Sequence, residues 1–181
     1  MKTRRSKAGE SSRVKTLVLS SLLIANALTI FILEAQLPPL VPLPGVKLGL
    51  ANIITLIAIV LLGGREGTKV HLVRIFLGSL FTGQAVSFLY SFSGGLCCLG
   101  VMLLCYRIGG QRYLWLTSVL AAVAHIGGQL AAAVWVLQNV SIFLYTPILL
   151  FSSILAGLLT GLCVQAVLKK HPNLLRLGQG K

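Results

Sequence analysis

The stretch PGVKLGLANIITLIAIVLLGG, from Pro44 to Gly64, sets the fold class of this chain. Beyond Lys47 it holds one strongly polar side chain, Asn52, and is otherwise almost wholly aliphatic. A helix that crosses a membrane needs about 20 largely apolar residues, so a run of this length predicts such a helix. An ammonium and an amide at its start are costly in lipid, and we therefore expect both to face other protein groups.

The rest of the chain has the same apolar character. Of its 181 residues, 56% are hydrophobic and 10% are charged, and the mean hydropathy is +0.90. Such values are outside the range of water-soluble domains. We predict an all-α integral membrane protein, with six transmembrane helices in one compact bundle (residues 16–168) between basic tails at residues 1–15 and 169–181. The apolar runs lie at residues 16–37, 48–64, 70–89, 92–106, 114–137 and 143–168.

The distribution of basic residues predicts the orientation of the bundle, because cytoplasmic loops collect Lys and Arg. The bases lie in the two tails and in the connections after the second and fourth runs, which hold Arg65, Lys69, Arg107 and Arg112. The opposite connections, near residues 38–47, 90–95 and 138–146, hold one base, Lys47. Both termini are therefore predicted to be cytoplasmic. The net charge of +13 lies beside the membrane, where anionic lipid is a nearer partner than nucleic acid.

Neither a metal site nor a cofactor motif is predicted. Four cysteines lie inside apolar runs without the spacing of metal ligands, so we interpret them as packing residues. The chain also lacks the GxxxxGK[ST] loop of ATPases, and any energy for transport has to come from a partner or a gradient. The cysteines are Cys97, Cys98, Cys105 and Cys163.

Polar side chains inside the apolar runs are the functional candidates, because lipid forces them toward the bundle interior. Counted at about 1.5 Å per residue, most of them fall in the outer half of the bundle. His125 and Gln129 are four residues apart and share one helix face. We predict a ligand pocket open to the outside, under a stiff proline-rich cover at residues 36–45. Its predicted lining is Glu34, Lys47, Asn52, Gln84, Tyr90, His125 and Gln129.

Each candidate also has a structural interpretation. Glu34 and Lys47 can pair across the first outer connection, and His125 and Gln129 can hydrogen-bond neighbouring helices. Asn52 can cap or join helices. Arg74 lies about 7 Å from the predicted inner edge, within reach of the interface, and we interpret it as structural; His71 carries no functional signal.

Small residues mark faces on which another helix can pack closely. The first run carries Ser21, Ala25 and Thr29 at four-residue spacing, and the last run carries Gly157 and Gly161. We predict the first stripe as a contact for a partner helix. Packing inside the bundle is the alternative for both stripes.

The opening stretch, together with RIFLGSLFTG (residues 74–83), SFLYSFSGGL (87–96) and AHIGGQL (124–130), resembles a family of bacterial membrane proteins. It is called the Gx transporter family or heptaprenyl diphosphate synthase component I, and the likeness spans roughly residues 14–170. That family looks like the substrate-binding S components of energy-coupling factor transporters. The resemblance implies a multi-pass protein of the bacterial plasma membrane that captures a small-molecule or amphipathic ligand.

The same resemblance implies partners: a transmembrane scaffold subunit and a pair of ATPases. In S components a stripe of small residues on the first helix contacts the scaffold. Here that stripe contains Ser21, Ala25 and Thr29 in place of the usual alanine pair.

The second family name implies prenyl transfer, which requires carboxylates to hold Mg²⁺ and diphosphate. This chain has no aspartate, and its acids are Glu10, Glu34 and Glu66, far apart in the sequence. We therefore predict a protein that is not an enzyme. Solute capture by an S-component-like subunit is the expected function. The alternative is a non-catalytic accessory subunit of a polyprenyl diphosphate synthase or of a quinone or redox pathway; a self-sufficient transporter comes third.

Overall fold

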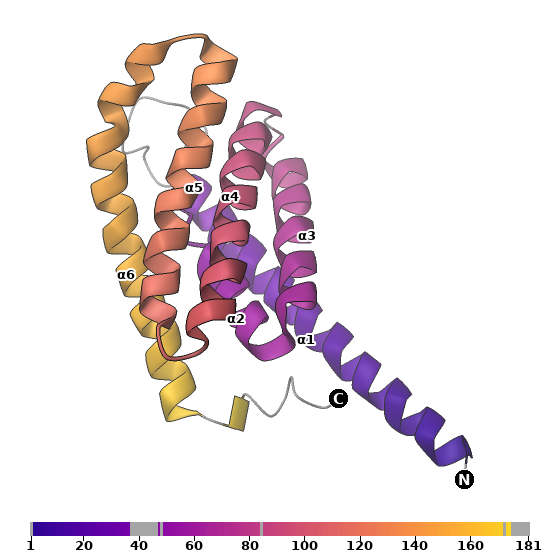
Figure 1. Cartoon of the computed structure of the whole chain (residues 1–181). Helices are drawn as coiled ribbons and strands as arrows, with labels where there is room; N and C mark the ends of the chain where they lie inside the picture. The colour runs from indigo at the N-terminus through magenta and orange to yellow at the C-terminus, as the bar shows by residue number, and fades with distance from the viewer. Residues whose placement is uncertain (1, 37–46, 48, 84, 172, 175–181) are drawn as a thin grey trace.

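The computed structural model describes residues 2–36, 47, 49–83, 85–171 and 173–174, and in this part of the chain all regular secondary structure is helical. Six α-helices form one bundle (Figure 1), which confirms the predicted fold class. In chain order the elements are α1 (Lys2–Gln36), α2 (Asn52–Leu62), α3 (Gly64–Thr82), α4 (Ala85–Gly109), α5 (Leu114–Leu137), the short 3₁₀ helix η1 (Val140–Tyr145) and α6 (Thr146–Lys170).

The connections alternate between the two ends of the bundle. In Figure 1 the α2–α3 turn, the α4–α5 turn and the end of α6 lie at one end, whereas the α3–α4 and α5–α6 connections lie at the other. Arg65, Lys69, Arg107 and Arg112 all belong to the first end. The basic residues thus gather at one end, as the charge pattern predicts. That this end faces the cytoplasm stays a prediction.

The lengths of the helices bear on how many of them cross the membrane. Among the described residues four segments are long and apolar enough to cross: residues 13–36, 85–109, 114–137 and 140–170. α2 has 11 residues, about 16 Å of helix, and is shorter than a hydrocarbon core of roughly 30 Å. α3 has 19 residues and carries Arg65, Glu66, Lys69 and Arg74. The count of six spans therefore stays a prediction.

Two predicted boundaries are wrong. The outer connection expected at residues 90–95 lies inside α4, and the chain turns instead at Gly83, whose φ is 62°. The glycines of this SGG segment serve close packing: a Cβ on Gly94 would come 2.7 Å from the His125 carbonyl oxygen. α4 is therefore a full 25-residue helix. Likewise Arg65 and Lys69, expected in a connection, lie in the first turns of α3, because Gly63 alone separates α2 from α3.

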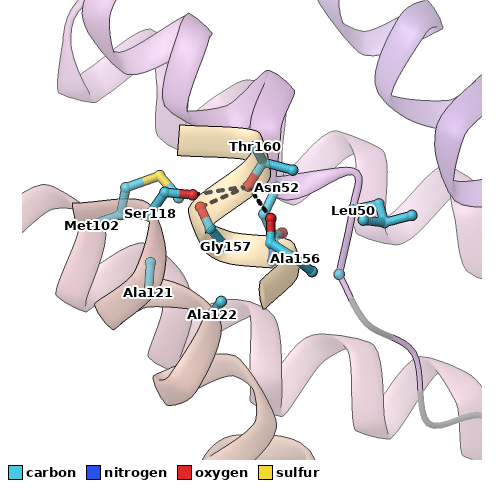
Figure 2. A pocket seen from close by; sticks show the side chains of 10 residues that line it. Leu50, Asn52, Met102, Ser118, Ala121, Ala122, Ala156, Gly157 and Thr160 are labelled. Atoms are coloured by element: carbon cyan, nitrogen blue, oxygen red, sulfur yellow. Dashed lines mark hydrogen bonds between the residues drawn. The ribbon is translucent and has the colours of Figure 1, made fainter. Parts of the chain in front are cut away.

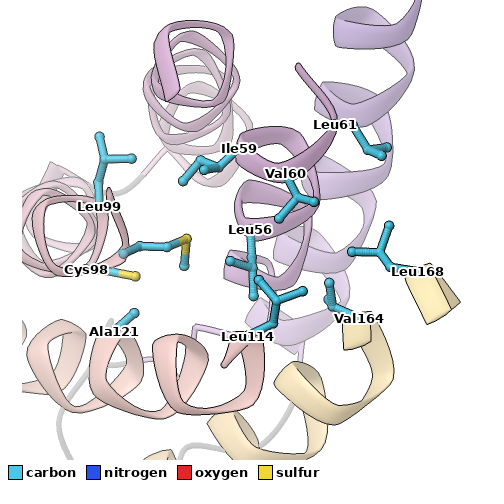
Figure 3. Packing of buried hydrophobic residues seen from close by; sticks show 11 residues of the cluster. Leu56, Ile59, Val60, Leu61, Cys98, Leu99, Leu114, Ala121, Val164 and Leu168 are labelled. Atoms are coloured by element: carbon cyan, nitrogen blue, oxygen red, sulfur yellow. The ribbon is translucent and has the colours of Figure 1, made fainter. Parts of the chain in front are cut away.

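The short α2 is the packing centre of the bundle. Its Leu56 and Ile59 are fully buried, and Figure 3 shows side chains of α4, α5 and α6 gathered around them. Cys98 of α4 is part of the same apolar cluster. A helix that is apolar on every side is stable only when it is enclosed. This enclosure holds Asn52, the first residue of α2, in a fixed place inside the protein.

Candidate functional site

A cavity beside the start of α2 collects polar side chains from four helices and from the segment that precedes α2. Its volume is about 10 Å³, which is room for about one water molecule. The predicted residues Glu34, Lys47, His125 and Gln129 all line it. The complete described lining is Phe31, Glu34, Lys47, Gly49, Arg74, Ser91, His125 and Gln129.

Glu34 fastens the segment before α2 to the end of α1. Its carboxylate, on a side chain only 7% exposed, accepts hydrogen bonds from the backbone N–H groups of Gly49 at 2.6 Å and Leu50 at 3.0 Å. Gly49 has φ of 80°, and a Cβ there would come 2.7 Å from Asn52 Nδ2. Glu34 is thus a clasp, as its structural interpretation holds, but it binds backbone amides and does not pair with Lys47. Among the described residues the only ion pair joins Lys69 and Glu66.

The side chain of Lys47 lies over the ring of Phe31, and its ammonium group has no hydrogen-bond partner among the described residues. Its ammonium nitrogen is buried and lies 3.6 Å from the ring centroid, a cation–π contact. Its backbone N–H donates to Gln129 Oε1 at 3.3 Å. The backbone of Lys47 is therefore held by α5, while its ammonium group contacts an aromatic face and forms no ion pair with a described carboxylate.

Arg74 is placed differently from the sequence interpretation. Its side chain is 3% exposed, so it points into the bundle and does not reach toward the interface. One terminal nitrogen donates to Asn52 Oδ1 at 3.1 Å, and Nε has no partner. The guanidinium carbon lies 6.0 Å from the Phe31 ring centroid. Arg74 is the charged residue of the described lining that the sequence analysis missed.

His71 hydrogen-bonds two neighbouring helices close to Arg74, although the sequence analysis found no functional signal in it. Its buried Nε2 lies 3.0 Å from the Gly95 carbonyl, which can only accept, so we assign the proton to Nε2. Nδ1 then accepts from Thr55 Oγ1 at 2.9 Å. The ring joins α2, α3 and α4 and lies one turn before Arg74. The i, i+3 spacing of His71 and Arg74 puts both side chains on one face of α3, and it was the sequence signal that could have identified His71.

His125 and Gln129 point inward together, as their spacing predicts. Both are buried, and Gln129 Nε2 donates to His125 Nε2 at 2.9 Å. This bond assigns the proton of the neutral imidazole to Nδ1. Gln129 therefore connects the histidine to the backbone of Lys47.

Of the remaining predicted lining residues, Tyr90 and Asn52 are not in the described lining of this cavity. Tyr90 is buried in an apolar cluster with Ile126, Leu130 and Leu149, and it lines neither described cavity. Gln84 lies outside the described residues, as does all of the predicted cover at residues 36–45 except Gln36. Asn52 lines the neighbouring cavity and reaches the first one through its bond to Arg74.

The neighbouring cavity, also about 10 Å³, shares only Gly49 with the first among the described lining residues. Figure 2 shows its wall of small and apolar side chains from α4, α5 and α6. Its hydroxyl groups satisfy one another: Ser118 Oγ lies 3.0 Å from Thr160 Oγ1, which also donates to the Ala156 carbonyl at 2.8 Å. No charged side chain is among its described lining residues.

The two small-residue stripes have different positions. A Cβ on Gly157 would lie 2.9 Å, and one on Gly161 2.6 Å, from backbone carbons of α5, so α6 uses its stripe inside the bundle. Ser21, Ala25 and Thr29 are exposed on α1 and leave their face open.

Comparisons with known proteins gave one match. The family model described as heptaprenyl diphosphate synthase component I matches residues 23–167, from α1 to α6. Searches of curated proteins and of solved structures found no match.

Proposed function

The chain belongs to the heptaprenyl diphosphate synthase component I family, and from this premise we propose that it is a non-catalytic membrane subunit of a polyprenyl diphosphate synthase. The observation that carries the proposal is the family match over residues 23–167. In this arrangement a separate catalytic subunit carries out prenyl transfer. The membrane subunit holds that partner at the bilayer, where the growing prenyl chain is soluble.

The carboxylates of the chain support the non-catalytic role. Mg²⁺-dependent prenyl transfer needs several carboxylates at one place. The Glu34 carboxylate is engaged by two backbone N–H groups, and Glu66 pairs with Lys69 at 2.7 Å at the start of α3. Glu10, the remaining acid, is 24 positions before Glu34 in the same helix, about 36 Å away. Three separated acids do not form a diphosphate–magnesium site.

The partner surface in this proposal is the basic end of the bundle. The α4–α5 turn carries Arg107 and Arg112, and α3 opens beside it with Arg65. A concentration of positive charge favours contact with an acidic protein surface and with anionic lipid.

Affinity purification from the native membrane tests the proposal. We expect the tagged chain to recover a polyprenyl diphosphate synthase subunit, and the double variant Arg107→Gln, Arg112→Gln to recover less of it. The matched control removes two charges from α1 with Arg13→Gln and Lys15→Gln and is expected to recover as much as the parent. Recovery of an ATPase module without any synthase contradicts the proposal.

The buried polar cavity favours a second candidate function, capture of a small solute for a transporter. Under this candidate the exposed stripe of Ser21, Ala25 and Thr29 docks a transmembrane scaffold, and ATPases supply the energy. Ligand pockets usually have about 300–1,000 Å³, so a nutrient needs far more room than this cavity offers. Binding assays on the purified protein test this candidate. Asn52→Ala and Gln129→Ala are expected to weaken binding, and unchanged affinity in both contradicts it.

A further inference from the structure

The charges around the Lys47 cavity do not balance. Its described lining contains one acid, Glu34, and two bases, Lys47 and Arg74. The neighbouring residues 37–46 and Leu48 have no ionisable side chain. With all three groups ionised, the site therefore carries one excess positive charge inside the bundle. Buried charges are tolerated when they are paired, and an unpaired one is strongly destabilising.

No other carboxylate side chain lies near enough to supply the missing negative charge. The sequence has no aspartate and three glutamates. Glu66 is bound to Lys69 at the opposite end of the bundle, and Glu10 is about 36 Å from Glu34 along α1. The counter-charge must therefore come from another molecule, or Lys47 must lose its proton. Arg74 cannot lose its own.

The hydrogen-bond donors around the cavity favour a counter-charge from another molecule over loss of the Lys47 proton. Lys47 Nζ and Arg74 Nε are both buried and have no hydrogen-bond partner in the described part of the chain, and both groups lie around the ring of Phe31. Glu34 does not complete them, because its carboxylate accepts from Gly49 and Leu50 and forms no ion pair within 4.0 Å with either base. Two unused cationic donors beside one small cavity are the arrangement that accepts an anionic oxygen.

We propose that this cavity binds one oxyanion group, a carboxylate or a phosphate, between Lys47 and Arg74. The volume of about 10 Å³ admits a single oxygen-sized group, so the site recognises the charged end of a ligand and not its bulk. The oxyanion belongs either to a water-soluble anion or to a lipid headgroup. The inference depends on the charge balance and the unpaired donors of this cavity and holds with either candidate function, so its failure leaves the recovery of a synthase partner unaffected.

Thermal unfolding of the full chain in nanodiscs of zwitterionic lipid tests the proposal. Acetate, inorganic phosphate and pyrophosphate are titrated at constant ionic strength, and a separate arm replaces part of the lipid with phosphatidylglycerol. We expect at least one arm to raise the unfolding midpoint in a saturable way, by about 5 °C at a large excess over the dissociation constant. A soluble anion as ligand raises it in the first arms, and a headgroup raises it in the last.

Variants at Lys47 decide whether the response belongs to this cavity. Lys47→Met is expected to weaken the apparent affinity at least tenfold, and Lys47→Arg, which keeps the charge, is expected to retain most of it. Lys69→Gln removes an exposed base at the other end of the bundle and is expected to leave the response unchanged. The proposal is overturned by a parent protein that responds in no arm, or by a Lys47→Met protein that responds as strongly as the parent.

Discussion

Two cavities of nearly equal size lie next to each other in this bundle, and they differ in charge. The one near Ser118 is lined by small apolar residues, and its two hydroxyl groups bond to each other and to the backbone. The one near Lys47 is lined by an acid and two bases, and three of its buried donors, Lys47 Nζ, Arg74 Nε and His125 Nδ1, have no hydrogen-bond partner among the described residues. The hydroxyl groups of the first cavity all have hydrogen-bond partners, as expected of a small packing defect between helices. The second cavity leaves buried hydrogen-bond donors without partners, and such unpaired donors in a buried site favour a binding function.

The largest effect is expected from removing the single acid of the charged cavity. Glu34→Gln leaves Lys47 and Arg74 without any negative charge and weakens the clasp on two backbone N–H groups. We expect a loss of about 3 kcal/mol in the free energy of unfolding, measured in detergent micelles. Glu66→Gln, which breaks the exposed pair with Lys69, is the control and is expected to cost less than about 1 kcal/mol. Equal losses in the free energy of unfolding would mean that Glu34 and Glu66 have equivalent surroundings, which contradicts the prediction.

A smaller effect is expected at the glycine that the two cavities share. Gly49→Ala imposes a Cβ on a backbone with φ of 80° and places it 2.7 Å from Asn52 Nδ2 and 3.0 Å from His125 Cδ2. We expect a loss of about 2 kcal/mol in the free energy of unfolding. Gly83→Ala has the same left-handed backbone, with φ of 62°, but no atom within 4 Å of the added carbon. It should therefore show the cost of backbone strain alone, about 1 kcal/mol. A loss at Gly49 no greater than at Gly83 would contradict the close packing at the cavity.

Opposite signs are expected for a carboxylate added next to Arg74 and for one added next to the hydroxyl pair of Ser118 and Thr160. Asn52→Asp replaces the amide oxygen that accepts from Arg74 at 3.1 Å, and in the absence of added oxyanion it should raise stability by about 1 kcal/mol. Ser118→Asp puts the same charge into the cavity without bases and should lower stability by about 2 kcal/mol or more. Chemical unfolding of both variants measures the difference. Destabilisation by both would mean that Lys47 is neutral and that the charged cavity is already balanced.

The contents of the charged cavity were partly predictable from the sequence, because lipid leaves costly side chains one direction in which to point. Glu34, Lys47, His125 and Gln129 were expected together on this ground, and the structure brings them to one cavity. The helical class follows from the same constraint, since a backbone in lipid has to satisfy its own hydrogen bonds.

The parts that were missed depend on packing between helices, which a linear pattern does not encode. Gly94 and Gly95 allow either a turn or a close approach, and the contact with His125 selects the second. Arg74 was given a depth from an assumed membrane edge, but its direction is set by contacts with Asn52 of α2 and with His71 one turn earlier in α3. Tyr90 has the right depth but turns toward Ile126.

The smallest effect is expected at the satisfied hydroxyl pair. Ser118→Ala removes one hydrogen bond, but Thr160 keeps its bond to the Ala156 carbonyl, so no buried donor is left without a partner. We expect a loss of less than about 1 kcal/mol in the free energy of unfolding. The response of the unfolding midpoint to oxyanions should be the same as in the parent, because this cavity contributes no charge. A Ser118→Ala protein that loses the oxyanion response would show that the two cavities act as one site, and the distinction between a packing defect and a binding site would then fail.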